Sequence, residues 1–159
     1  MFLHRLGGRG LARRAGRAAA AATLSSALLA GAVPTAFAAL NTGYTGSLSL
    51  SATTITMGTP IIVRQSATNL TSTQVPFITV GIRRLGFTVT AVTKPRTGIC
   101  RIAGSATCSS LLLAPYETQT YTLTLTPNAP GTYQIQGWTT QPTAGGGPGT
   151  LQTVTVTVH

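Results

Sequence analysis

Acidic side chains are almost absent from this 159-residue sequence, which contains one Glu, Glu117, and no Asp. Histidine is nearly as rare, with only His4 and His159. Hydrolysis by paired carboxylates needs two acids, and a Ser-His-Asp triad needs an acid beside its histidine, so neither arrangement is available. A calcium site needs several oxygen ligands that include acids, and a catalytic zinc site needs three protein ligands. We therefore expect no catalytic residue, no metal site and no cofactor.

The first 38 residues have the features of a secretory signal peptide that is cleaved after Ala38. Arginines without any acid precede a small apolar run over 18–33, and Ala36-Phe37-Ala38 supplies the small-x-small cleavage pattern. The run is too short and too rich in alanine for a membrane span. General secretion is favoured, and Arg13-Arg14 keeps the twin-arginine route open. The sequence predicts a helical signal peptide over 1–38, a flexible leader over 39–46 and one secreted or surface-associated domain over 47–159.

The basic charge of the whole chain is concentrated in the predicted signal peptide. The formal net charge is +10, and five of the eleven Lys and Arg residues lie before residue 18. The six that remain, against one acid, are too sparse to indicate a nucleic-acid partner. Most of them lie close together in the sequence: Arg83, Arg84, Lys94, Arg96 and Arg101. They would form an anion-binding patch if the strand expected over residues 85–92 lay beside a hairpin formed by Cys100 and Cys108. The alternative is that they are solvated charges that protect an edge strand.

The two cysteines, Cys100 and Cys108, are predicted to form a disulfide, because an exported chain meets an oxidising compartment. Gly104 and Ser105 in the middle of the intervening segment indicate a hairpin. The spacing excludes a CxxC redox motif. By the chain-entropy argument, a ring of this length stabilises the fold by about 2.5 kcal/mol.

Alternation of apolar and polar residues predicts an all-β domain. From Gln119 to Thr126 the odd-numbered positions are Gln, Tyr, Leu and Leu, while every even-numbered position is Thr. Pro127 ends this strand, and a Pro-Gly turn follows before the alternation restarts at Tyr133, which predicts two antiparallel strands and their connection. The apolar parity reverses near Thr53 and Thr54, so we expect a bulge there or a switch of the first strand between sheets.

Short strands separated by Pro and Gly recur along the rest of the chain, without helical periodicity or internal repeats. Further strands are expected over residues 61–70, 75–82, 85–92, 99–102, 107–113 and 151–159. This pattern favours an immunoglobulin-like antiparallel β-sandwich of about seven to nine strands.

A series of short motifs also occurs in a characteristic order: Gly58-Thr59-Pro60 before a strand that ends in Thr68-Asn69, then Leu85-Gly86-Phe87-Thr88, the cysteine pair, Leu113-Ala114-Pro115-Tyr116-Glu117 and Pro130-Gly131-Thr132-Tyr133. The order resembles that of the bacterial immunoglobulin-like surface domains classed as domain of unknown function eleven. Around the strand expected over residues 85–92 and the Pro-Gly turn, Arg83, Arg84 and Tyr116 partly replace the acidic residue and glycine that are usual in that family. The resemblance implies a sandwich fold and an extracellular spacer or adhesive module, with no catalytic residue and no agreed ligand.

Tyr133 and Trp138, followed by a Gly-rich loop over 141–149, form a second candidate binding site. If Trp138 is exposed beside this loop, it can stack on a sugar or anchor a protein partner. The alternative is that Trp138 lies in the core of the sandwich. The sequence therefore predicts a secreted, non-enzymatic structural or adhesive module of the bacterial cell envelope, with a cell-wall polymer or another envelope protein as partner. The alternative function is binding of anionic glycans or wall polymers through the basic residues.

Overall fold

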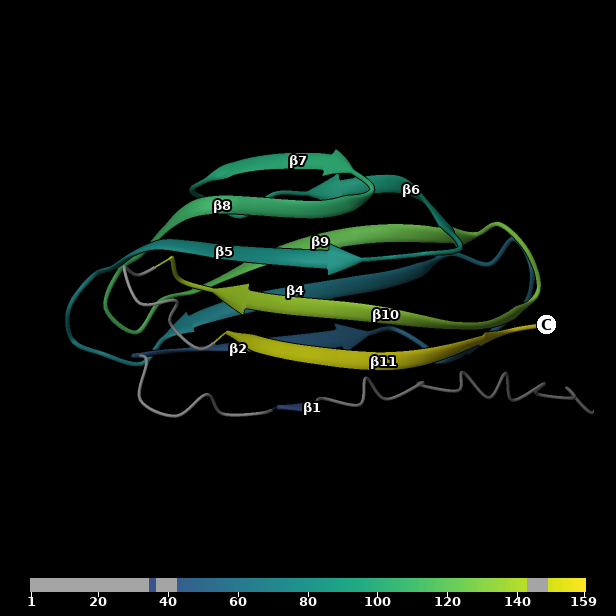
Figure 1. Ribbon diagram of the computed structural model, residues 1–159, viewed down its shortest axis with the longest axis horizontal. Helices are drawn as coiled ribbons and strands as arrows, with labels where there is room; N and C mark the ends of the chain where they lie inside the picture. Colours follow the sequence, from purple (N-terminus) through teal and green to yellow (C-terminus); the bar gives the residue numbers. More distant parts are fainter. Residues whose placement is uncertain (1–34, 37–42, 143–148) are drawn as a thin grey trace, which may run out of the picture.

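The computed structural model describes residues 35–36, 43–142 and 149–159. These residues form two stacked β-sheets and contain no helix (Figure 1). The predicted all-β, immunoglobulin-like sandwich is confirmed, and nine strands of five residues or more are present in the described part of the chain. The predicted helical signal peptide, apart from 35–36, lies outside the described residues.

The first sheet has the order β1-β2-β4-β9-β6, and all of its neighbours pair antiparallel. Its strands are β1 (Thr35–Ala36), β2 (Tyr44–Leu50), β4 (Ile61–Asn69), β6 (Phe87–Thr93) and β9 (Thr118–Pro127). β2 begins at Tyr44, which pairs with Asn69 on β4, whereas the domain was expected to begin at residue 47. The Tyr44 side chain is only 1% exposed and packs in the core. Residues 44–46 of the predicted leader therefore belong to the sandwich.

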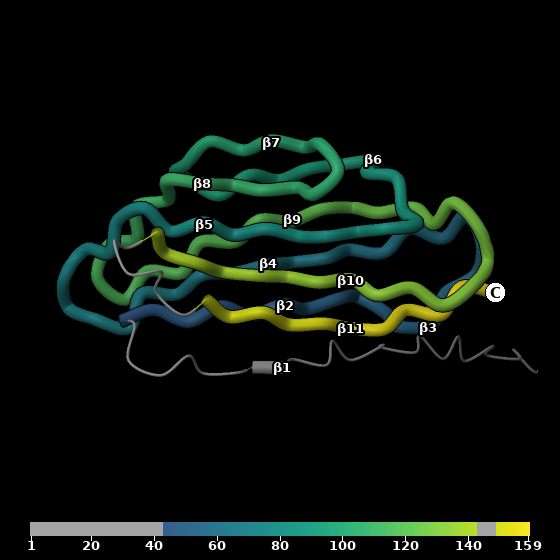
Figure 2. Tube along the Cα trace, viewed as in Figure 1, coloured from purple at the N-terminus to yellow at the C-terminus, as the bar shows by residue number. Residues whose placement is uncertain are grey.

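The second sheet has the order β3-β11-β10-β5-β8-β7. Its strands are β3 (Thr54–Ile55), β5 (Val75–Arg83), β7 (Ile99–Ala103), β8 (Ser105–Leu113), β10 (Gly131–Thr140) and β11 (Thr150–Val158). β3 is the parallel partner of β11 and lies beside it in Figure 2. The chain thus passes from the first sheet to the second between β2 and β3, which confirms the sheet switch indicated by the parity reversal.

β9 and β10 do not pair with each other, because β9 lies between β4 and β6 while β10 lies between β11 and β5. The Pro-Gly turn between them therefore crosses from one sheet to the other and does not close a hairpin. The predicted pair of strands exists, but each contributes to a different layer of the sandwich.

The core between the sheets consists of alternate residues from both layers. Its largest fully buried aliphatic side chains are Leu48, Ile61, Ile78, Ile82, Leu111, Leu113, Leu123, Leu125 and Ile135. Polar side chains also join the layers: Gln65 Nε2 donates to Thr139 Oγ1 at 2.9 Å, and Gln152 Nε2 donates to the Gly46 carbonyl at 3.3 Å. Each bond satisfies a buried amide N–H that would otherwise cost free energy.

Candidate functional site

Trp138 lies on the outer face of the second sheet and is not part of the core. Ile135, Gly137 and Thr139, which have the opposite parity on β10, are buried, while the Trp138 side chain is half-buried. Its directly opposed residue on β5 is Gly81. A Cβ added at Gly81 would overlap the indole atoms Cζ2, Cε2 and Cη2, so the indole packs against the sheet over this glycine. A glycine inside a strand often marks such a close approach, and this signal for Gly81 was present in the sequence.

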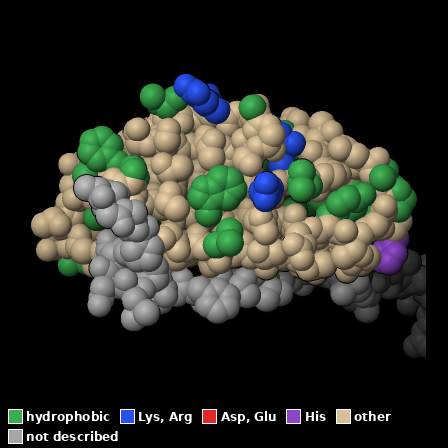
Figure 3. All heavy atoms as spheres, in the orientation of Figure 1, with side chains coloured by type: hydrophobic (Ala, Val, Ile, Leu, Met, Phe, Trp, Pro, Cys, Tyr) green, Lys and Arg blue, Asp and Glu red, His purple; other side chains and the backbone are tan. Residues whose placement is uncertain are grey.

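Apolar and basic side chains share the outer face of the second sheet with Trp138. The strand register places Leu151, which is 64% exposed, next to Trp138 on β11, and it places Thr107 and Arg101 beyond Gly81 on β8 and β7. Arg83 is exposed two residues along β5 from Gly81. We call these five side chains the Trp138 face: Arg83, Arg101, Thr107, Trp138 and Leu151. Figure 3 shows basic side chains beside apolar ones on this side of the molecule, with no acidic side chain in view.

The five basic residues that the sequence grouped together do not converge. Arg83 and Arg101 share the Trp138 face, but Arg84 is half-buried and donates from Nη1 to the Phe87 carbonyl at 2.9 Å. Lys94 is exposed in the β6–β7 loop, and Arg96 pairs with Glu117. The reason is topological, because the chain leaves β5 for the first sheet at β6 before it returns to the second sheet at β7.

Glu117 is held in the turn between β8 and β9. Its Oε2 accepts the Ala114 N–H at 2.7 Å, and the Arg96 guanidinium donates from Nε to Oε1 and from Nη2 to Oε2, both at 3.0 Å. This is the bidentate geometry that strengthens an arginine–carboxylate pair. The backbone bond from Ala114 is the main cause that lowers the pKa of Glu117. Burial acts in the opposite direction, and the bond and charge of Arg96 and the bond from Gln119 lower the pKa further. The one acidic side chain therefore has a structural role.

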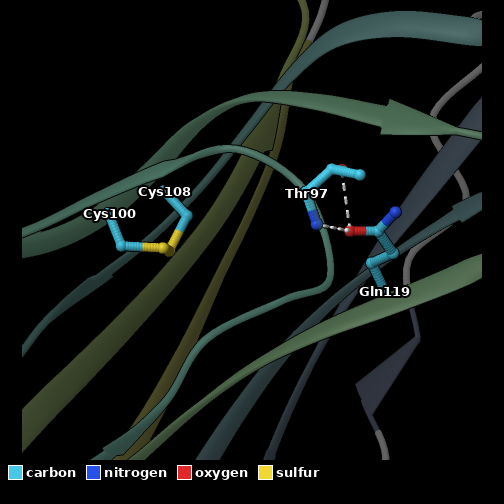
Figure 4. The surroundings of a disulfide bond; sticks show 4 residues. All are labelled: Thr97, Cys100, Cys108 and Gln119. Carbon is cyan, nitrogen blue, oxygen red and sulfur yellow. Dashed lines mark hydrogen bonds between the residues drawn. A yellow bond between two sulfur atoms is a disulfide. The ribbon is translucent and has the colours of Figure 1, made fainter.

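The disulfide hairpin is anchored to the first sheet through the same region (Figure 4). Cys100 and Cys108 are directly paired residues of β7 and β8 and form the predicted disulfide. In the preceding loop, the backbone N–H and the hydroxyl of Thr97 both donate to Gln119 Oε1, at 3.1 and 3.0 Å. Gln119 Nε2 also donates to the Leu112 carbonyl at 2.8 Å. The strand that carries Arg101 is therefore fixed at both the disulfide and the loop.

Tyr133 and Trp138 do not form one binding surface, because they lie on opposite faces of β10. The Tyr133 hydroxyl donates to the Ala129 carbonyl at 3.0 Å and also lies 3.3 Å from the Pro130 carbonyl, within its own turn. Its ring packs edge-on against Phe87, with the ring centres 5.4 Å apart. Tyr133 therefore stabilises the crossing between the sheets, as the tyrosine corner of immunoglobulin-like domains does. Most of the Gly-rich loop, residues 143–148, lies outside the described residues.

The described residues offer neither a cluster of metal ligands nor a membrane-spanning helix. Across 35–36, 43–142 and 149–159, no group of three or more His, Cys, Asp or Glu residues is placed to hold a metal ion. Within the same ranges, no helix is long and apolar enough to cross a membrane.

No protein-family model matches the chain, and no curated protein matches it. A CARDB domain from Pyrococcus furiosus has 15% identity and a TM-score of 0.46, covering 73% of this chain and 94% of that domain. AvmM, described as catalysing macrocyclization in alchivemycin A biosynthesis, has 14% identity and a TM-score of 0.45, covering 81% and 89%. AggA, the major subunit of aggregative adherence fimbriae type I from Escherichia coli, has 12% identity and a TM-score of 0.35, covering 80% and 96%. The immunoglobulin-like sandwich rests on the two sheets described above, and membership of the domain-of-unknown-function-eleven family stays a prediction.

Proposed function

We propose that this chain is a secreted, non-enzymatic adhesive module of the bacterial cell envelope or extracellular space, and that it adheres through the Trp138 face. The observation that supports this function is the half-buried indole over Gly81, with Arg83 and Arg101 on the same outer face. An aromatic ring held against a sheet offers a large apolar surface with little conformational freedom left to lose on binding. The exposed arginines add charged donors that suit carboxylate and phosphate groups.

The ligand class that fits this face is an anionic glycan or wall polymer. The sheet register runs from Leu151 through Trp138, Gly81 and Thr107 to Arg101, which crosses four strand spacings, or roughly 19 Å. A polymer lying along this row would place a sugar ring on the indole while its acidic groups meet the arginines. Basic side chains without an acidic neighbour also attract such a polymer over a distance, in a manner that salt weakens.

The test is binding of the processed protein to purified anionic wall polymer, measured by calorimetry and by pull-down at low and at physiological salt. We expect Trp138→Ala and the double variant Arg83→Ser/Arg101→Ser each to weaken binding by about tenfold or more, which corresponds to roughly 1.4 kcal/mol. Only the arginine variant should also reduce the salt dependence. Arg64→Ser is the matched control, because Arg64 is exposed on the outer face of the other sheet.

Three results would overturn the proposal. The first is that wild-type protein does not bind the polymer at low salt. The second is that Trp138→Ala binds as tightly as the wild type. The third is that Arg64→Ser weakens binding as much as the arginine pair does, because the interaction would then depend on overall charge rather than on the Trp138 face.

A further inference from the structure

The outer edge of β2 is open in the processed chain if the predicted signal cleavage takes place. Along its inner edge β2 pairs with β4 from Tyr44 to Leu50. Along its outer edge, β1 is its partner among the described strands, and the pairing covers only Ser47 and Leu48. β1 lies before the predicted cleavage site after Ala38, so cleavage removes it. Backbone N–H and C=O groups along this edge are then left without a strand. The Gly46 carbonyl keeps its bond from Gln152 Nε2, and its second lone pair is available to a further donor.

β2 also lacks the features that protect edge strands from pairing with other chains. The opposite edge of the first sheet, β6, has a register shift between Val89 and Ala91 and is followed by Lys94 and Pro95. The edge strands of the second sheet are β7, which carries Arg101 and a disulfide, and β3, which has only two residues. β2 has seven residues, YTGSLSL, with no charge, no proline and no bulge. Such a strand is a template for strand addition.

We propose that β2 pairs antiparallel with β2 of a second copy of this chain, so that the first sheets of two copies join into one continuous sheet. An antiparallel pairing centred on Ser47 is two-fold symmetric and places Ser47 opposite Ser47. It also places Thr45 opposite Ser49 of the second copy, on the outer face. On the inner face, Leu48 lies opposite Gly46, and Leu50 lies opposite Tyr44.

The first sheet already contains the cross-strand contacts that this pairing would repeat. Ser66 and Thr120 are directly opposed on β4 and β9, with their hydroxyl oxygens 2.8 Å apart, and so are Thr68 and Thr118. Hydroxyl pairs of this kind stabilise neighbouring strands. The β1–β2 pairing shows that the edge accepts an antiparallel strand at Ser47 itself. A second copy therefore supplies an uncharged strand whose hydroxyl side chains can pair with those of β2, independently of any ligand on the Trp138 face.

The test is sedimentation velocity of the processed, secreted protein over a range of concentrations. We expect a concentration-dependent dimer for the wild type. Ser47→Lys should shift the protein to monomer, because two lysines would then lie directly opposite each other. A mixture of Ser47→Lys and Ser47→Glu should dimerise again. Thr124→Lys is the matched control, because Thr124 lies on the same outer face on β9, between β4 and β6.

The proposal is overturned if the processed wild type is monomeric at every concentration, or if Ser47→Lys dimerises as strongly as Thr124→Lys does. Circular dichroism establishes that each variant is folded. Binding of Ser47→Lys to wall polymer is measured in parallel. Because the Trp138 face is unchanged in this variant, loss of the dimer with retained binding separates this interface from the adhesive function.

Discussion

Gly81 and Trp138 are directly opposed on β5 and β10, and the indole of Trp138 occupies the space in which a side chain at position 81 would lie. The glycine and the tryptophan therefore act as a pair. The position of the aromatic ring on the outer face depends on a missing side chain in the neighbouring strand.

Gly81→Ala is expected to displace the indole and to destabilise the fold by about 1–3 kcal/mol through overpacking. The fluorescence of Trp138, the only Trp in the chain, reports the displacement, and urea unfolding reports the stability. In a Trp138→Ala background the same substitution should cost much less, because the overlapping ring is gone. An equal cost in both backgrounds would contradict the pairing of these two residues.

Asn69 joins the end of β4 to the turn between β8 and β9. The side chain is 1% exposed, and its amide donates to the carbonyls of Thr73, Leu113 and Ala114 at 2.7, 3.2 and 2.8 Å. Asn69→Asp keeps the shape and removes these donors, so we expect a loss of about 3 kcal/mol in the free energy of unfolding. Asn128→Asp, at an exposed position, is the control and should change stability little. Equal effects of the two substitutions in urea unfolding would show that Asn69 is not an anchor.

Glu117 makes the stability of the fold dependent on acid pH. The bond from the Ala114 N–H, together with Arg96, lowers its pKa below the ordinary value of 4.5. A carboxyl group with a lowered pKa in the folded state contributes stability that is complete above its unfolded pKa and is lost as the pH falls through its folded pKa. The melting temperature of the wild type should therefore fall below about pH 4.5 more steeply than that of Glu117→Gln. Parallel curves for the two proteins would contradict this role. The C-terminal carboxyl group also titrates at acid pH, but it is common to both proteins and does not account for a difference between them.

Tyr116 has a left-handed backbone conformation, with φ of 58°, in the turn from Ala114 to Glu117. The Glu117 N–H donates to the Ala114 carbonyl at 3.1 Å, and Pro115 precedes the strained position, as in a type II turn that favours glycine there. Tyr116→Gly should therefore raise the free energy of unfolding by about 0.5–1 kcal/mol. Tyr116→Ala keeps the Cβ and is the control. If Tyr116→Ala raised the melting temperature as much as Tyr116→Gly does, the gain would not come from removal of the Cβ.

The sequence pattern predicted the features of the fold that depend on local alternation. The parity of β9 placed Tyr121, Leu123 and Leu125 on the buried side, and the reversal near Thr53 and Thr54 indicated the sheet switch. The crossing between β9 and β10 was not predictable, because a Pro-Gly turn has the same chemistry whether it closes a hairpin or joins two sheets.

The candidate site was only partly predictable for related reasons. The even parity of Trp138, opposite to that of the buried Ile135, was a signal for the outer face. Gly81 and Arg101, which share this face with Trp138, come from other strands, and their positions depend on the strand order, which sequence spacing does not reveal. The same dependence explains why Arg83 and Arg84, although adjacent in the sequence, have different roles: Arg83 is exposed on the sheet, while Arg84 donates to a backbone carbonyl.

The disulfide should determine how firmly β7 is held at the edge of the second sheet. Replacement of Cys100 and Cys108 by Ser is expected to lower the free energy of unfolding by about 2.5 kcal/mol, from the chain entropy of a short ring. The domain should stay folded, because Thr97 still holds the loop to Gln119. Hydrogen exchange at neutral pH should rise over residues 99–103, whereas β4, between two strands of the first sheet, should be unaffected. Unchanged exchange in β7, or a uniform rise over the whole domain, would show that the disulfide does not act locally on the strand that presents Arg101.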